Sequence, residues 1–107
     1  MAILENRKYR RFPLRYRVQL HFRDKGGDSQ LDGVTKNASM GGLLLESSSP
    51  IPKPCPVSFR ITVPGGQGTL PIEILGEGEV VRVESERTGP GFAIALQFVR
   101  PIEWHRV

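Results

Sequence analysis

The chain has 107 residues, the usual length of one domain. Nine prolines, twelve glycines and short runs of β-branched and aromatic residues favour an all-β protein and argue against long helices. Cys55 is the only cysteine, which excludes an intrachain disulfide and a cysteine-based metal cluster. Residues 1–25 carry eight Lys and Arg against two acidic residues, whereas residues 26–107 carry seven against nine. This distribution suggests one localised anion site; a solvated charged tail is the plainer reading.

The first residues lack the apolar segment of a signal peptide, and the longest aliphatic run, residues 43–45, is too short to span a bilayer. We therefore expect a soluble, cytoplasmic protein that makes no membrane contact. Residues 1–15 show no sustained periodicity, which predicts a flexible basic arm ahead of the folded domain.

Apolar and polar residues alternate over residues 16–23, which predicts a half-buried strand. Residues 24–30 provide a turn, and residues 31–36 return as a second strand. If the two strands are antiparallel and of similar length, residues near 37 come back close to residues near 15.

Later strands are predicted at residues 42–47, 57–63, 70–84 and 92–98. The third of these is long enough to serve two neighbours, with a bulge or bend near Gly76 and Gly78. Pro101 could open at most a short C-terminal helix, on which Trp104 would cover one barrel end. The six or seven short strands favour closure into a small barrel, with a two-sheet sandwich as the alternative.

A first candidate binding motif is the run of residues 10–15, in which Arg10, Arg11 and Arg15 surround Phe12 and Pro13. Guanidinium groups bind phosphates with two hydrogen bonds, stack on flat rings and pair with the O6 and N7 edge of guanine. Arg7 and Arg11 have the same spacing as Arg11 and Arg15, but the second pair lies immediately before the first predicted strand.

A second candidate lies at residues 37–42, Asn-Ala-Ser-Met-Gly-Gly, between the second and third predicted strands. Asn37 and Ser39 could simply close a turn with their own side chains, with Gly41 and Gly42 providing positive φ. The functional alternative is that both side chains present hydrogen-bonding groups to a ligand, while the glycines let a base or phosphate approach the backbone.

Together, Arg-x-x-x-Arg before the first strand and Asn-x-Ser-x-x-Gly after one hairpin resemble the signature of the PilZ domain family. Residues 78–82 and 91–98 look like the closing strands of the same family, so the resemblance covers nearly the whole chain. It implies a basic arm over residues 1–15 and a six-stranded antiparallel β-barrel over residues 16–107. It also implies a non-catalytic bacterial receptor for the second messenger cyclic di-GMP.

The resemblance further implies a role for each motif residue. Arg11 and Arg15 would contact guanine edges and phosphates, Asn37 and Ser39 would hydrogen-bond the ligand, and Gly41 and Gly42 would leave room for it. Arg10 would be placed to engage a second, intercalated ligand molecule. Many family members have Asp at position 37, and since an amide offers only one acceptor oxygen, we expect a weaker contact there.

The arginines repel one another, so we expect their loop to close on the anionic ligand and to alter a surface that binds an unidentified effector protein. The chain would be a monomer or a weak dimer. A single-stranded nucleic-acid-binding barrel is the alternative function, thinly supported because aromatic and basic residues cluster only near Tyr9, Phe12 and Tyr16. A domain that works through protein contacts alone ranks last, because both motifs are present.

The sequence predicts neither a metal site nor a catalytic one, and no cofactor. His21 and His105 are the only histidines, and no Cys or His partner stands at ligand spacing. Ser39 lacks the sequence context of a catalytic nucleophile.

Overall fold

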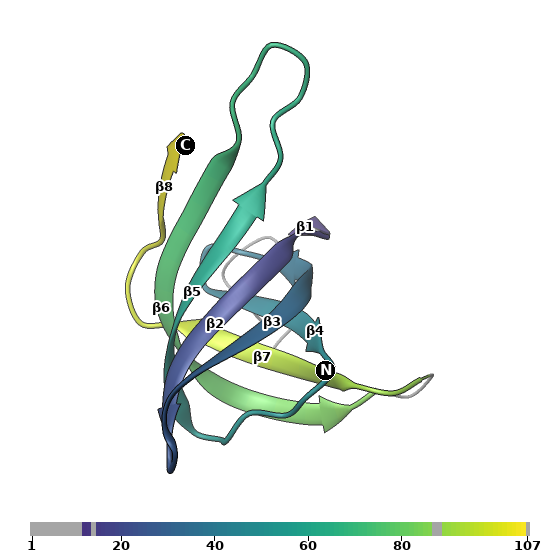
Figure 1. Ribbon diagram of the computed structural model, residues 1–107, viewed down its shortest axis with the longest axis vertical. Helices are drawn as coiled ribbons and strands as arrows, with labels where there is room; N and C mark the ends of the chain where they lie inside the picture. Colours follow the sequence, from purple (N-terminus) through teal and green to yellow (C-terminus); the bar gives the residue numbers. More distant parts are fainter. Residues whose placement is uncertain (1–11, 14, 87–88, 107) are drawn as a thin grey trace.

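The computed structural model describes residues 12–13, 15–86 and 89–106, and these residues contain strands and loops but no helix (Figure 1). Six strands pair antiparallel in the order β3-β2-β5-β6-β7-β4, and the pairing of β3 with β4 closes the circle. The predicted closed antiparallel barrel is confirmed. In chain order the strands are β1 (Phe12–Pro13), β2 (Arg17–Asp24), β3 (Gly27–Ala38), β4 (Gly42–Ser47), β5 (Cys55–Val63), β6 (Ile72–Ser85), β7 (Phe92–Phe98) and β8 (Glu103–Arg106).

Alternation of apolar and polar residues places one side of each barrel strand in the core. In β2, for example, Val18 and Leu20 are fully buried, whereas His21 is exposed. The buried apolar side chains form one cluster inside the barrel, made of Val18, Leu20, Leu43, Leu45, Ile51, Cys55, Val57, Phe59, Ile61, Val80, Ile94 and Leu96.

The β2–β3 hairpin turns over only two residues, Lys25 and Gly26, instead of the longer turn that the sequence predicted. The Asp24 carboxylate accepts hydrogen bonds from the hydroxyl of Ser29 (2.7 Å) and the N–H of Gly26 (2.8 Å), and these bonds hold the pKa of Asp24 below its usual value. Gly27 follows with a φ of 106°, which favours glycine. The second strand therefore begins earlier than expected and runs for twelve residues.

The barrel contains two β-bulges, and neither lies at the position near Gly76 and Gly78 where the sequence predicted a bulge or bend. One bulge makes Lys36 the extra residue of β3 against β4, and the other makes Val81 the extra residue of β6 against β7. Gly76 instead leaves space for the ring of Phe59, which a Cβ at this position would overlap. The long strand does serve two barrel neighbours, as predicted: β6 pairs with β5 in its first half and with β7 in its second half.

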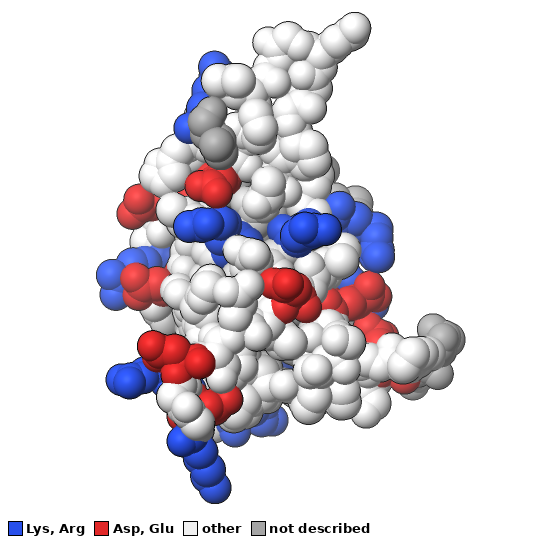
Figure 2. Space-filling view, in the orientation of Figure 1, with Lys and Arg blue, Asp and Glu red and all other residues white. Residues whose placement is uncertain are grey.

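Beyond the barrel, the β5–β6 hairpin continues upward and β8 runs along β6 (Figure 1). The C-terminal segment is thus a strand, where the sequence allowed a short helix. Trp104 stands opposite Ile74 and is 62% exposed, so it does not cover a barrel end as predicted. The hairpin tip forms a white, uncharged projection in Figure 2. Among the described residues, no helix has the length and hydropathy needed to cross a membrane.

Candidate functional site

The chain ahead of β2 lies alongside the end of β3, as the hairpin argument predicted. Strand β1 pairs with β3, with Phe12 opposite Ala38 and Pro13 opposite Asn37. Three residues later, the N–H of Tyr16 donates to the Thr35 hydroxyl (2.9 Å), and the Thr35 N–H donates to the Tyr16 carbonyl (2.9 Å). Arg15 stands between these two attachments and so lies close to the Asn37 turn.

Of the three arginines in the predicted site, the structure describes Arg15; Arg10 and Arg11 lie outside the described residues. The Arg15 side chain is 65% exposed, and its Nη2 lies 3.4 Å from Glu46 Oε1 on β4. The sequence did not predict this partner. A carboxylate therefore offsets part of the positive charge at the predicted anion site.

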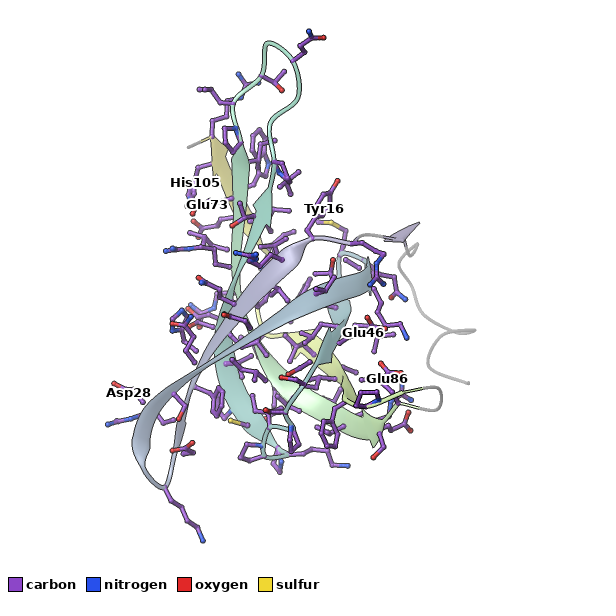
Figure 3. All side chains as sticks on the ribbon, turned by 45° about the vertical axis from the view of Figure 1, so that its right-hand side comes forward. Tyr16, Asp28, Glu46, Glu73, Glu86 and His105 are labelled. Carbon is purple, nitrogen blue, oxygen red and sulfur yellow. The ribbon has the colours of Figure 1, made fainter. Side chains whose placement is uncertain are left out.

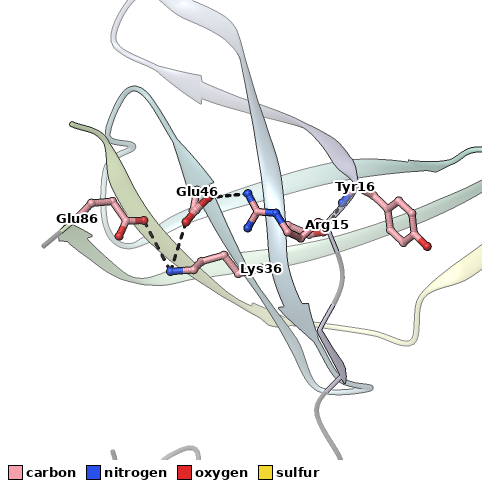
Figure 4. Close-up of polar contacts among 6 residues, drawn as sticks. Arg15, Tyr16, Lys36, Glu46 and Glu86 are labelled. Carbon is pink, nitrogen blue, oxygen red and sulfur yellow. Dashed lines mark hydrogen bonds and ion pairs between the residues drawn. The ribbon is translucent and has the colours of Figure 1, made fainter. Parts of the chain in front are cut away.

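The ion pair of Arg15 is the first link of a series that crosses β3 and β4 (Figure 4). Glu46 Oε2 lies 3.4 Å from Lys36 Nζ, which in turn lies 3.9 Å from Glu86 Oε1. Lys36 is the extra residue of the β3 bulge, and bulges re-aim side chains in this way. Figure 3 shows Glu46 and Glu86 on one side of the barrel. Two basic and two acidic side chains, with Arg15 as the first, thus alternate along the series.

The turn after β3 is closed by its own groups. The Ser39 hydroxyl oxygen accepts the N–H of Gly41 (3.1 Å), and the Ser39 N–H donates to the Gly42 carbonyl (3.0 Å). The Gly41 carbonyl accepts the N–H of Phe98 (3.0 Å), which ties the turn to β7. The structural interpretation of this motif is therefore correct at Ser39, whose hydroxyl still has its own hydrogen to donate. It is wrong at Gly41 and Gly42, because neither glycine has the positive φ that it expected.

Gly42 has a structural reason to be glycine. A Cβ at this position would lie 2.5 Å from the carbonyl oxygen of Leu96 on β7. Its predicted role, to leave room for a ligand, remains a prediction.

Asn37 is half-buried and stands opposite Leu44 on the outer face of the barrel. On the neighbouring strands, Leu44 is opposite Ala95 of β7, and Ala95 is opposite Arg82 of β6. A cavity of about 480 Å³ lies beside the ion-pair series and is lined in part by Asp32, Glu46 and Glu86. Carboxylates do not suit an anion, so the Asn37 side of Arg15 is the better place for phosphates.

In the described part of the chain, no group of three or more His, Cys, Asp or Glu is arranged to hold a metal ion. Cys55 is buried in the barrel, where burial and, to a lesser degree, the charge of Asp24 raise the pKa of its thiol.

No curated protein matches the chain. Among solved structures, the chain is similar to the inhibitor of motility MotI/DgrA of Bacillus subtilis, with a TM-score of 0.68 and 18% identity. That match covers 90% of this chain and 44% of the other, so the chain spans less than half the length of that protein. The PilZ domain of CeSA from a cellulose-synthesizing bacterium has a TM-score of 0.58 and 25% identity, with 85% of this chain and 82% of that chain covered.

A third similar structure is the PilZ domain of YcgR from Escherichia coli, determined with c-di-GMP, with a TM-score of 0.59 and 14% identity over 89% of this chain and 79% of the other. The model of the PilZ domain family matches residues 5–105, nearly the entire sequence. PilZ domains are non-catalytic, which agrees with the expectation that the chain is not an enzyme. The chain belongs to the PilZ domain family.

Proposed function

We propose that this PilZ domain is a cyclic di-GMP receptor whose ligand lies against the outer barrel face beside Arg15, Asn37 and Ser39. The observation that carries the proposal is the attachment of the segment before β2 to the end of β3 at Pro13 and Tyr16. This attachment brings the two halves of the family motif, distant in sequence, to the same place. The similar PilZ domain of YcgR, determined with c-di-GMP, supports the choice of ligand.

The chemistry of the residues fits a doubly anionic, guanine-bearing ligand. The Arg15 guanidinium is suited to a phosphate or to the O6 and N7 edge of guanine. The Asn37 amide and the Ser39 hydroxyl offer both donors and acceptors at the adjoining edge of the barrel. Arg10 and Arg11, which lie outside the described residues, are proposed to bind the ligand together with Arg15.

Binding is proposed to exchange partners at Arg15. Without ligand its guanidinium lies against Glu46 at 3.4 Å; with ligand it turns to the phosphates, which can accept two parallel charge-assisted hydrogen bonds from it. The arginine segment then closes over the ligand, and the surface that it covers changes for an effector protein. A loss of amide hydrogen exchange over residues 7–17 on ligand addition is expected; identical exchange in both states would contradict the closure.

Calorimetric titration with cyclic di-GMP tests the binding itself. Arg15→Ala removes charge-assisted hydrogen bonds worth about 1.5–3 kcal/mol, so we expect roughly 10- to 100-fold weaker binding. Arg23→Ala is the matched control, because Arg23 is likewise an exposed arginine paired with a carboxylate, Asp28, but lies at the far end of the β2–β3 hairpin. Equal affinity of the wild type and Arg15→Ala would move the site elsewhere. Tight binding of oligonucleotides that cyclic di-GMP does not displace would favour the nucleic-acid function.

A further inference from the structure

A row of four outward-facing residues crosses the barrel wall, starting at Asn37 of the candidate site. Asn37 on β3 is opposite Leu44 on β4, Leu44 is opposite Ala95 on β7, and Ala95 is opposite Arg82 on β6. The row thus ends at an arginine that the family motif does not include.

The bulges fix which residues of the row point outward. Lys36 is the extra residue beside Asn37, and Val81 is the extra residue beside Arg82, so the row has a bulge at each end. The neighbouring rows on both sides face the core; they comprise Thr35, Leu45, Ile94 and Val83 on one side and Ala38, Leu43, Leu96 and Val80 on the other. Since side chains alternate between the two faces of a sheet, the row between them faces outward.

Between Asn37 and Arg82 the outer wall is low and largely apolar. Only Leu44 and Ala95 separate them, and the next outward residues along β7 are Ala93 on one side and Gln97 on the other. The two ends of the row are three strand spacings apart, about 14 Å along the wall at roughly 4.8 Å per spacing. A flat purine could lie over Leu44 and Ala95, between Gln97 on one side and the two glutamates opposite Ala93, Glu46 and Glu84, on the other.

Arg82 is only weakly engaged within the protein. Its Nε lies 4.0 Å from Glu84 Oε1, at the limit of an ion pair, and its side chain is 31% exposed. A guanidinium held at the edge of an apolar floor can present two parallel N–H groups to the O6 and N7 atoms of guanine, which adenine does not match.

We infer that Arg82 is a further ligand-binding residue, which reads the O6 and N7 edge of a guanine lying over Leu44 and Ala95. The inference rests on the proposed cyclic di-GMP function and extends the site across the barrel wall from β3 to β6. It also gives the site a residue that selects guanine, at the opposite end of the row from Asn37.

The test is a titration of the wild type, Arg82→Ala and Arg82→Lys with cyclic di-GMP and with cyclic di-AMP, which has the same two phosphates. One guanine-reading arginine contributes enough for roughly 10-fold or greater loss of cyclic di-GMP affinity in Arg82→Ala. Cyclic di-AMP binding should change little, so discrimination between the two ligands falls. Arg82→Lys should not restore it, because an ammonium lacks the two parallel donors.

Arg60→Ala is the control, since Arg60 is also exposed and paired with a carboxylate, Glu73 at 3.5 Å, but lies on β5 away from the row. Wild-type binding with unchanged affinity in Arg82→Ala would overturn the inference and leave the proposed function standing. If Arg82→Ala loses affinity equally for both ligands and Arg82→Lys restores it, the proposal that Arg82 recognises guanine is overturned. No binding by the wild type would overturn both. If Arg82→Ala does not fold, the comparison of the wild type with Arg82→Lys for the two ligands tests the inference instead.

Discussion

The carboxylate of Glu46 competes with the proposed ligand for Arg15, so its removal should strengthen binding. Glu46→Gln keeps the size and shape of the side chain but removes its charge. In the ligand-free protein Arg15 then loses the negative charge at 3.4 Å, while Lys36 keeps Glu86 at 3.9 Å. The guanidinium no longer has to leave an ion pair before it meets a phosphate.

The size of the effect follows from the exposure of the pair. Arg15 is 65% exposed and Glu46 33%, and a pair of this kind is worth about 0.2–1 kcal/mol in water. If the whole of this energy is recovered on binding, cyclic di-GMP affinity rises by about 1.4- to 5-fold. The effect is small because solvent already screens most of the attraction.

Calorimetric titration at low and at high salt separates this local effect from a general change in charge. Asp28→Asn is the control: it makes the same change in net charge and breaks the exposed pair of Arg23 and Asp28 at the far end of the hairpin. We expect Glu46→Gln to bind more tightly than this control at low salt, with a difference that shrinks as salt screens the pair. Weaker binding by Glu46→Gln would refute the competition and make Glu46 a ligand contact.

Two further predictions concern the barrel itself. Gly76→Ala should lose about 1–3 kcal/mol of unfolding free energy in urea because its methyl group overlaps the ring of Phe59, whereas Gly89→Ala, with no atom within 4 Å of the added Cβ, should not; equal stability of the two variants would show that the ring moves aside. Burial raises the pKa of Cys55, with a smaller contribution from Asp24. The contribution of the protonated Cys55 thiol to stability should therefore be fully present below pH 9.0, the ordinary pKa of the thiol. It should be lost as the pH rises through the raised pKa of the thiol in the folded protein. Denaturation of the wild type and Cys55→Ala across this range measures it, and parallel pH profiles would contradict it.

Much of the fold follows from local alternation. The strands at residues 42–47 and 92–98 were predicted with their observed ends, because turn residues flank each of them. The bulge in β6 was misplaced because glycine marks both bulges and close approaches. Only the packing of Phe59 against Gly76 shows which one applies there. The last strand was missed because its pairing with β6 comes from an extension of the β5–β6 hairpin that residues 101–107 do not encode by themselves.

The candidate site, too, was predicted from the sequence only in part. Arg15 and Asn37 were brought together in the prediction by the length of one hairpin, which is a local property. The ion pair with Glu46 and the row that ends at Arg82 depend on how β4, β7 and β6 align, and that register is set by two bulges with no sequence mark of their own. Neither residue could be assigned to the site from spacing alone.

The two hydrogen bonds between Tyr16 and Thr35 have a consequence for the accuracy of the site. They fix the chain one residue after Arg15 to a position on β3 that is two residues before Asn37. Both halves of the motif are therefore held by the same strand, β3. A small distortion of the barrel moves Arg15 and Asn37 together and leaves the distance between them unchanged. The spacing that a rigid ligand must match is set within β3 and is insulated from changes in how the other strands are arranged.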